Sequence, residues 1–235
     1  MAIEASPATK LQVKSRERVR DHGEVFTAER EVKAMCDLVG DVGSNPTAGT
    51  VLEPACGNGN FLVEILNRKC DRLDAAGCRV GGRSMKWRWQ IADRYAFHLS
   101  GVLSLLYGID ILPDNVVECR RRLVEIVLSR FDAVARGRDD SSRRVLENAA
   151  GVISEVNIVC GDALTMETSA SEPIVFVKWR MEESGDRFRF GVTPYYFAKI
   201  VGDDGREGDL FETLPKLDRS PQILFREIEK VREYV

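Results

Sequence analysis

The feature that most constrains the fold is a short apolar segment followed by two glycines and a helical pattern, within residues 50–69. Residues 50–54 read TVLEP, which predicts a short buried strand that the proline ends. Gly57 and Gly59 follow, and from Phe61 to about Lys69 apolar residues recur at helical spacing. A strand, a glycine loop and a helix form half of a nucleotide-type βαβ unit. We therefore expect a parallel sheet whose ligand sites lie at the carboxyl ends of its strands.

Strand and helix patterns alternate along the rest of the chain. They predict helices over residues 28–39, 89–103 and 113–131, and strands over residues 105–109, 156–159 and 173–178. Thr27 is the expected cap of the first of these helices. The charge-rich residues 132–148 predict a loop or an exposed helix, residues 195–201 a further strand, and residues 221–235 an amphipathic terminal helix. We therefore expect an α/β fold with a Rossmann-like, mostly parallel sheet and helices on both faces.

The composition is that of an ordinary globular chain. With 235 residues, 44% hydrophobic and 30% charged, the chain fits one large domain, and collagen-like and disordered classes are excluded for most of its length. No apolar run approaches the roughly 20 residues of a membrane-spanning helix, and the N-terminus lacks the apolar core of a secretory signal. We expect a cytoplasmic protein without membrane contact, in which residues 1–22 form a basic flexible arm or a loosely attached helix and residues 23–235 form the domain.

The cysteines do not predict disulfides or a metal site. Six cysteines are spread widely through a chain that is large enough to stabilise itself without cross-links, so we interpret them as reduced thiols. The sequence contains no C-x-x-C pair, and its two histidines lie far from any two neighbouring cysteines. No metal is therefore predicted.

Acidic residues stand at the ends of the first three predicted strands. Glu53 precedes the glycine loop, where a carboxylate would repel a pyrophosphate, so a cationic or hydroxyl-bearing ligand suits the loop better. Asp110 and Asp162 end the next two strands, beside the loop in a parallel sheet. The alternative is that these two acids only cap the helices that follow, and that the loop is a tight turn without a ligand.

The segment EPACGNGNF, residues 53–61, resembles the glycine loop of the S-adenosylmethionine-dependent amino-methyltransferases that act on adenine in DNA. This resemblance implies a class I methyltransferase fold with S-adenosylmethionine as cofactor. It implies that Glu53 and the backbone from Gly57 to Gly59 contact the methionine part. The other cofactor-binding residues that it implies within this loop are Pro54, Ala55, Cys56 and Phe61.

Three further segments resemble motifs of the same family, in the same order along the chain. Residues 23–27, GEVFT, resemble its upstream motif, in which Phe26 and Thr27 would close over the methionine end. Residues 107–111, YGIDI, resemble its second-strand motif, so Asp110 would accept hydrogen bonds from the ribose hydroxyls, next to Ile111. Residues 160–164, CGDAL, resemble its third motif, in which Asp162 would bind the adenine amino group, with Ala163 and Leu164 near the ring.

The acceptor half of the family's site has no clear counterpart. The family ends its fourth strand in Asn (or Asp)-Pro-Pro-Tyr (or Phe), whereas this chain has Lys178-Trp179-Arg180 there. Trp179 is a candidate for stacking on a flipped base, but its neighbours carry no acceptor for the target amine. The nearest substitute is Thr193-Pro194-Tyr195, followed by Tyr196, which we take as the other candidate catalytic segment. The alternative is that these aromatic residues belong to the core.

A basic stretch over residues 68–94 interrupts the expected fold. Arg79, Arg83, Lys86 and Arg88, with two tryptophans among them, are candidates for phosphate contacts and stacking on nucleic acid. The alternative is a solvated loop with two buried tryptophans. The residues after the fourth strand are too few for a separate recognition domain, so DNA and a specificity or restriction subunit are the expected partners.

The predicted function is thus S-adenosylmethionine-dependent methylation of adenine N6 in DNA, within a restriction-modification or related defence system. Two alternatives stay open. One is a methyltransferase-like module that binds cofactor or a partner without methylating. The other is a methyltransferase that acts on RNA or protein.

Overall fold

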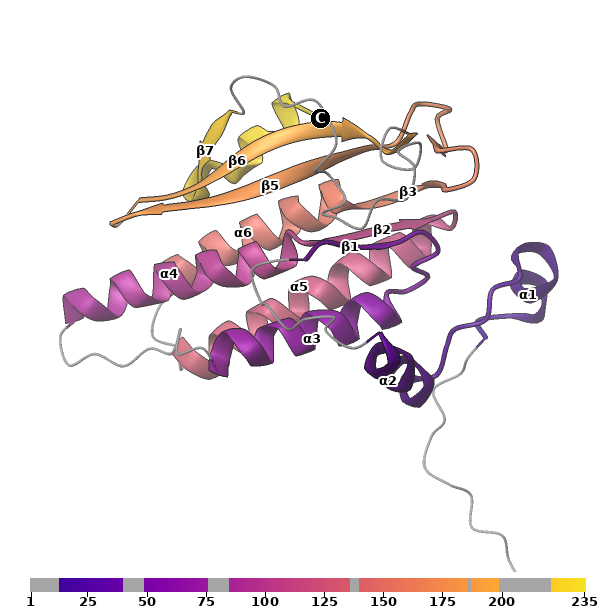
Figure 1. Ribbon diagram of the computed structural model, residues 1–235, viewed down its shortest axis with the longest axis horizontal. Helices are drawn as coiled ribbons and strands as arrows, with labels where there is room; N and C mark the ends of the chain where they lie inside the picture. Colours follow the sequence, from indigo (N-terminus) through magenta and orange to yellow (C-terminus); the bar gives the residue numbers. More distant parts are fainter. Residues whose placement is uncertain (1–12, 40–48, 76–84, 136–139, 186, 199–220) are drawn as a thin grey trace, which may run out of the picture.

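The computed structural model describes residues 13–39, 49–75, 85–135, 140–185, 187–198 and 221–235; for residues 22 and 85–91 it describes the backbone alone. Figure 1 shows three layers. A layer of helices lies on one side, a small sheet continued by two helices lies in the middle, and a second sheet covers the other side. The described part is therefore a mixed α/β structure.

The middle layer contains the sheet that was predicted from the strand, glycine loop and helix pattern of residues 50–69. Its strands are β1 (Val51–Glu53), β2 (Leu106–Asp110), β3 (Ile158–Asp162) and β4 (Glu167–Thr168), in the order β1-β2-β3-β4. The first three are parallel and β4 is antiparallel to β3. Glu53 pairs with Gly108, and Asp110 pairs with Cys160, so the three strands end at one common edge. The expectation of an α/β chain with a mostly parallel sheet is confirmed.

The helices are α1 (Arg16–His22), α2 (Glu29–Leu38), α3 (Asn60–Ala75), α4 (Met85–Leu103), α5 (Pro113–Ala135) and α6 (Asp140–Asn157). Helix α3 packs against α5 and α2, whereas α4 packs against α6. Helix α4 leads almost directly into β2, and α6 leads directly into β3. The helices expected near residues 28–39, 89–103 and 113–131 are confirmed. Thr27 does not cap α2, however, because Ala28 takes the cap position with no side-chain hydrogen bond.

Helix α6 corrects one expectation. We expected a loop or an exposed helix over residues 132–148 and a strand from 156, but α6 continues to Asn157 and β3 begins at Ile158. One face of α6 is fully buried, with Leu146, Ala149 and Ile153 in the core. Small residues such as Ala149 let neighbouring helices approach closely, and this face packs between α4 and α5. The charged residues at the start of α6 are the reason that its amphipathic pattern was not recognised in the sequence.

The second sheet also differs from expectation. It consists of β5 (Val175–Ser184), β6 (Arg187–Tyr196) and β7 (Gln222–Leu224), all antiparallel, and a 3-10 helix, η1 (Phe225–Glu233), follows. The segment expected to be a fourth parallel strand is therefore the first arm of a hairpin whose two arms have ten residues each. The expectation of a strand over 195–201 is wrong, because the second arm begins at Arg187 and ends at Tyr196; residues 197 and 198 are not in a strand, and residues 199–201 lie outside the described ones. Gly185, with φ +63, sits in the turn where a left-handed backbone is needed.

Strand β5 runs opposite to the parallel strands. Ile174, just before β5, approaches Gly161 at the carboxyl end of β3. Further along β5, Trp179 bonds to Asn157 at the end of α6, and Glu183 lies beside His98 in α4. The chain therefore turns back after β3, and the carboxyl end of β5 lies away from the glycine loop (Figure 1).

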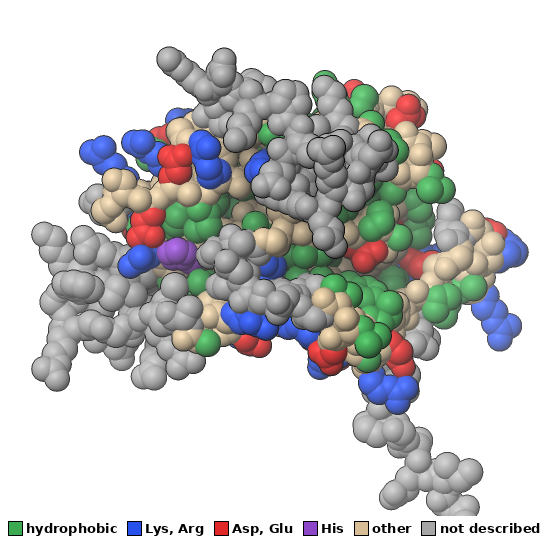
Figure 2. All heavy atoms as spheres, in the orientation of Figure 1, with side chains coloured by type: hydrophobic (Ala, Val, Ile, Leu, Met, Phe, Trp, Pro, Cys, Tyr) green, Lys and Arg blue, Asp and Glu red, His purple; other side chains and the backbone are tan. Residues whose placement is uncertain are grey.

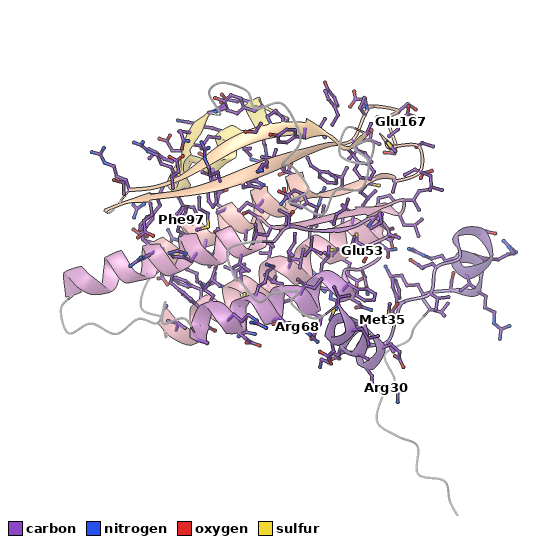
Figure 3. The ribbon with its side chains drawn as sticks, in the orientation of Figure 1. Arg30, Met35, Glu53, Arg68, Phe97 and Glu167 are labelled. Carbon is purple, nitrogen blue, oxygen red and sulfur yellow. The ribbon has the colours of Figure 1, made fainter. Side chains whose placement is uncertain are left out.

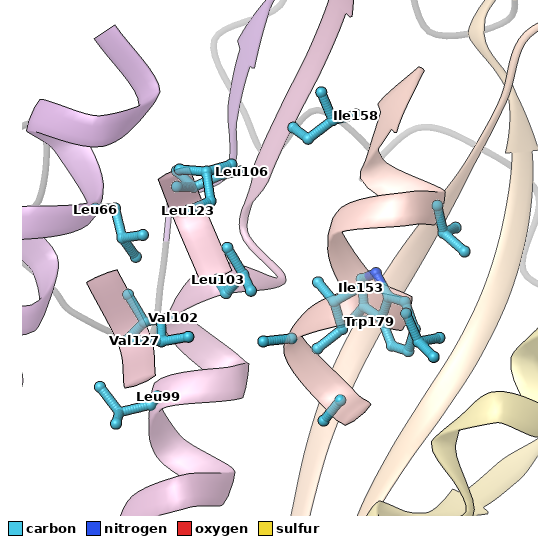
Figure 4. Close-up of a cluster of buried hydrophobic side chains, with 14 of the residues drawn as sticks. Leu66, Leu99, Val102, Leu103, Leu106, Leu123, Val127, Ile153, Ile158 and Trp179 are labelled. Atoms are coloured by element: carbon cyan, nitrogen blue, oxygen red, sulfur yellow. The ribbon is translucent and has the colours of Figure 1, made fainter. Parts of the chain in front are cut away.

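A single apolar core joins the layers. Phe97 of α4 points toward the second sheet, where its ring lies 4.9 Å from Phe190 and 5.4 Å from Phe225 (Figure 3). Figure 4 shows aliphatic side chains from several helices and strands in the same buried cluster, together with Trp179. The aromatic residues of β6 and η1 thus attach the hairpin sheet to α4 and α6.

Candidate functional site

The glycine loop adopts a backbone that only glycine enters easily. Gly57 has φ +54 and Gly59 has φ +88, and the Cys56 N–H donates to the Ile109 carbonyl at 2.9 Å, which fixes the loop against β2. A Cβ added at Gly59 would lie 2.5 Å from the Cys119 sulfur. The second glycine is therefore required both by the turn and by the close approach of α5.

Asp110 holds this loop from the end of the neighbouring strand. The Gly57 N–H donates to its Oδ2 at 2.9 Å, and the Leu112 N–H and the Asn115 amide donate to its Oδ1 at 2.9 and 3.2 Å. Asp110 thus joins the loop, β2 and the first turn of α5, which is more than a helix cap. A carboxylate has about four acceptor positions, so about one, on Oδ2, stays available for a ligand hydroxyl.

Glu53 and Asp162 lie at the same edge of the sheet. Burial raises the pKa of the half-buried Glu53 carboxyl, and a hydrogen bond involving the Ala55 backbone opposes this shift. Figure 3 shows Glu53 where β1 meets the glycine loop. Asp162 accepts the Leu164 N–H at 2.8 Å through Oδ1, which shapes the turn after β3. A cation bound at this edge would favour the charged form of Glu53.

Two apolar side chains stand exposed where β2 and β3 end. Ile111 is 54% exposed and Leu164 is 91% exposed, whereas Ala163, directly after β3, packs against the core. Exposed large apolar side chains beside strand-end acids offer contact surface for a flat apolar ring.

The segment that precedes α2 closes one side of the loop. A Cβ added at Gly57 would lie 3.3 Å from the Phe26 ring, and the Thr27 carbonyl accepts the Asn60 amide at 2.9 Å. The Lys14 ammonium lies 5.7 Å from the centre of the Phe26 ring. The residues of the predicted upstream motif and of the glycine loop are therefore in direct contact.

A partly buried polar network beside Asp110 was missed by the sequence analysis. Glu24 accepts two hydrogen bonds from the Arg18 guanidinium, at 2.6 and 2.7 Å, and one from Asn115 at 2.6 Å. Burial alone would raise the pKa of Glu24, but these bonds outweigh it and the pKa is lowered. The bonds attach α1 to the first turn of α5. The only sequence signal was an Asn five residues after the strand-end Asp110.

The candidate acceptor residues belong to the hairpin sheet. Trp179 is 7% exposed and its indole N–H donates to Asn157 at 2.9 Å, so it belongs to the core and no face is open for stacking on a base. Thr193, Pro194 and Tyr195 lie within β6 opposite β5, rather than in a loop that reaches the glycines. The prediction that Trp179 stacks on a base is therefore wrong, and Thr193, Pro194 and Tyr195 lie in a paired strand instead of the displaced loop that was expected.

The predicted nucleic-acid residues fall outside what the structure describes. Arg79 and Arg83 lie outside the described residues, and Lys86 and Arg88 lie in the part of α4 whose side chains are not described. The described part of the N-terminal segment, residues 13–22, includes α1, and Figure 2 shows Lys and Arg side chains projecting from it at the edge of the molecule.

A groove of about 1180 Å³ opens on the helical side of the loop. It lies between α2, α3 and α5, and Phe26, Thr27, Asn58 and Asn60 line the part next to the loop. Its cations are largely matched by acids, as where Arg68 bonds to Glu64 at 2.8 Å. Neither Glu53 nor the two strand-end aspartates line this groove, so the sheet edge and the groove are separate surfaces.

Comparisons with known proteins do not identify a family for this chain. No family model, curated protein or solved structure matches the chain. Across the described ranges no helix has the length and apolar character needed to cross a membrane. The same ranges contain no cluster of three or more His, Cys, Asp or Glu side chains suited to a metal, and their five cysteines are all free thiols, Cys78 lying outside them.

Proposed function

We propose that the chain binds S-adenosylmethionine at the carboxyl edge of β1, β2 and β3, and that it is a methyltransferase-type domain with a Rossmann-like class I arrangement of these strands. The observation that carries the proposal is the bond from Gly57 to Asp110, which joins the glycine loop to the strand-end acid at 2.9 Å. A glycine loop with an acid beside it suits a ligand that carries both hydroxyls and positive charge.

The residues at the edge fit the parts of this cofactor by their chemistry. Glu53 suits the cationic amino group, and the remaining acceptor position on Asp110 suits a ribose hydroxyl. The exposed Ile111 and Leu164 suit the faces of the adenine ring, with Asp162 as an acceptor for its amino group. When bound, the cofactor would supply an electrophilic methyl group. The chain's own residues would orient it and keep the sulfonium end in place.

Whether the chain transfers the methyl group by itself or only together with a partner subunit is a separate question. An adenine amine of DNA that accepted the methyl group would displace the thioether of the cofactor and would lose a proton, and oxygen acceptors of the chain would be needed to stabilise the charge on the amine and to take that proton. Trp179 is buried and Thr193 lies in β6 opposite Lys178 of β5, so neither places a described acceptor beside the glycine loop. This observation favours a cofactor-binding domain that relies on a partner subunit for the acceptor, over an enzyme that methylates DNA alone.

Calorimetry with S-adenosylmethionine tests the cofactor proposal. We expect Asp110→Asn to weaken binding at least about tenfold, because the carboxylate that accepts a hydroxyl and the loop N–H is lost. Asp132→Asn is the matched control, because Asp132 bonds only to the surface residue Arg143 among the described contacts. Failure of the wild-type chain to bind the cofactor would overturn the proposal.

Transfer is measured separately with S-adenosylmethionine labelled in its methyl group. Label in unmethylated genomic DNA, absent in Asp110→Asn, would establish the autonomous DNA enzyme and refute the dependence on a partner. Cofactor binding with no label in DNA, RNA or the protein itself supports the cofactor-binding domain.

A further inference from the structure

Asn115 uses every hydrogen-bonding position of its side chain. It lies in the first turn of α5 and is 1% exposed. Its amide nitrogen donates to Glu24 at 2.6 Å and to Asp110 at 3.2 Å. Its carbonyl oxygen accepts from Lys14 at 2.8 Å and from Arg18 at 3.3 Å. An amide side chain offers two donor and two acceptor positions, and all four are occupied here.

These four bonds join two parts of the site that are distant in sequence. Lys14, Arg18 and Glu24 belong to the segment around α1, whereas Asp110 holds the Gly57 N–H of the glycine loop. Of the common side chains of this size, only asparagine can donate to both carboxylates and accept from both cations. Aspartate would offer no donor, and leucine would offer neither donor nor acceptor.

We propose that Asn115 is a positioning residue, which couples the docking of residues 14–26 to the orientation of Asp110 and through it to the glycine loop. The predicted consequence for cofactor affinity rests on the proposed function, whereas the coupling itself does not. Removal of the amide donor would leave two carboxylates facing each other and would free Asp110 to turn away from Gly57.

The first experiment follows hydrogen exchange of two peptides, residues 13–26 and 54–60, in the full chain. In Asn115→Asp the new carboxylate repels Glu24 and Asp110, so we expect both peptides to exchange at least about tenfold faster. Asn148→Asp is the matched control, because Asn148 also donates to a carboxylate, that of Glu229, but does so on the surface. This control should leave both peptides unchanged.

A second substitution separates positioning from general destabilisation. In Glu24→Gln/Asn115→Asp the amide and the carboxylate exchange places, so the new glutamine can donate to the new aspartate, which still accepts from Arg18. We expect residues 13–26 to regain their protection, whereas residues 54–60 stay fast because nothing at position 115 donates to Asp110. Recovery of both peptides together, in step with stability in urea, would overturn the proposal.

Arg18→Ala tests the same coupling if the variants at position 115 fail to fold. Arg18 lies on the peripheral helix α1, and its loss removes the bonds to Glu24, Asp114 and Asn115 without a change in the core. We expect residues 54–60 to exchange faster by a factor of about three or more, with a matching loss of cofactor affinity. Arg20→Ala is the control on the same helix, because Arg20 pairs only with its neighbour Asp21 in the described contacts. Unchanged exchange of the loop in Arg18→Ala would refute the coupling.

Calorimetry with S-adenosylmethionine on the same variants keeps the two proposals distinguishable. If the wild type binds no cofactor while the exchange pattern holds, the proposed function fails and the coupling stands. If the wild type binds and Asn115→Asp binds equally well, the positioning role is overturned and the proposed function stands.

Discussion

Substitution of Gly59 by alanine tests the geometry of the glycine loop most directly. Gly59 has φ +88, a region that alanine enters with strain of about 1–2 kcal/mol. The added Cβ would lie 2.5 Å from the sulfur and 3.3 Å from the Cβ of Cys119, which is fully buried in α5. Relief requires a shift of roughly an ångström in packed surroundings, which costs about 1–3 kcal/mol. We expect Gly59→Ala to lower the free energy of unfolding by about 2–5 kcal/mol.

Two other glycines separate the strain from the steric contact. Gly23 has φ +64 but nothing within 4 Å of an added Cβ, so Gly23→Ala should show the strain alone, about 1–2 kcal/mol. Gly151 lies in α6 with open space around it, so Gly151→Ala should stabilise the chain by up to about 1 kcal/mol. Urea unfolding followed by circular dichroism measures all three.

The steric part is isolated by repeating Gly59→Ala in a Cys119→Ala background. The closest contact is then absent, and the cost of the substitution should fall by about 1–3 kcal/mol. The reasoning is refuted if Gly59→Ala costs no more than Gly23→Ala, or if its cost is the same with and without the Cys119 sulfur.

Three further predictions follow from single groups. Trp179→Phe leaves Asn157 without its indole donor and should cost about 1–3 kcal/mol in urea unfolding while cofactor affinity stays unchanged; a loss of affinity at equal stability would restore a role for Trp179 at the site. Burial lowers the pKa of Lys69 to about 8 from its ordinary 10.5. Between about pH 8 and pH 10.5 Lys69 is protonated in the unfolded chain but not in the folded one. The free energy of unfolding of the wild type should therefore rise with pH over this range, by up to about 3 kcal/mol relative to that of Lys69→Met. A difference between wild type and Lys69→Met that stays constant with pH would contradict this. The bonds from Arg18 and Asn115 together outweigh burial and lower the pKa of Glu24, so the stabilisation by the Glu24 carboxylate is present above about pH 4.5 and is lost as the pH falls further. Glu24→Gln should weaken the protection of residues 13–26 against hydrogen exchange at neutral pH. In this variant the protection should also change less than in the wild type when the pH falls from about 5 to 3.

The first half of the fold was predictable because its signals are local. The strand, the two glycines and the helix from Val51 to Ala75 follow each other without interruption, and each acid at a strand end stands next to a recognisable strand. Parallel pairing then brings Glu53, Asp110 and Asp162 to one edge without further information.

The second half was not predictable from these patterns. The apolar run before Lys178 fits a buried parallel strand and an arm of a hairpin equally well, and only pairing with β6 decides between them. Trp179 was a candidate for stacking because it stands at a strand end in the parallel interpretation. In the structure β5 continues past Trp179 to Ser184, and the indole is buried and bonds to Asn157.

The network around Asn115 was hidden for a different reason. Its bonds join residues about 90 to 100 positions apart, and no pattern of spacing along the chain records them. A fully bonded buried amide can be recognised only when its neighbours from both segments are known.

The hairpin leaves β5 as an outer strand, since in the described part of the chain it pairs with β6 alone. The backbone groups along its other side are a template on which a second chain can add a strand. Two features oppose this. The Tyr107 hydroxyl donates to the Val177 carbonyl at 2.7 Å, and charged side chains, including Arg180 and Glu182, follow along the strand. Neutral, β-branched residues at positions 180 and 182 should therefore make the protein aggregate more readily, even where its stability is unchanged.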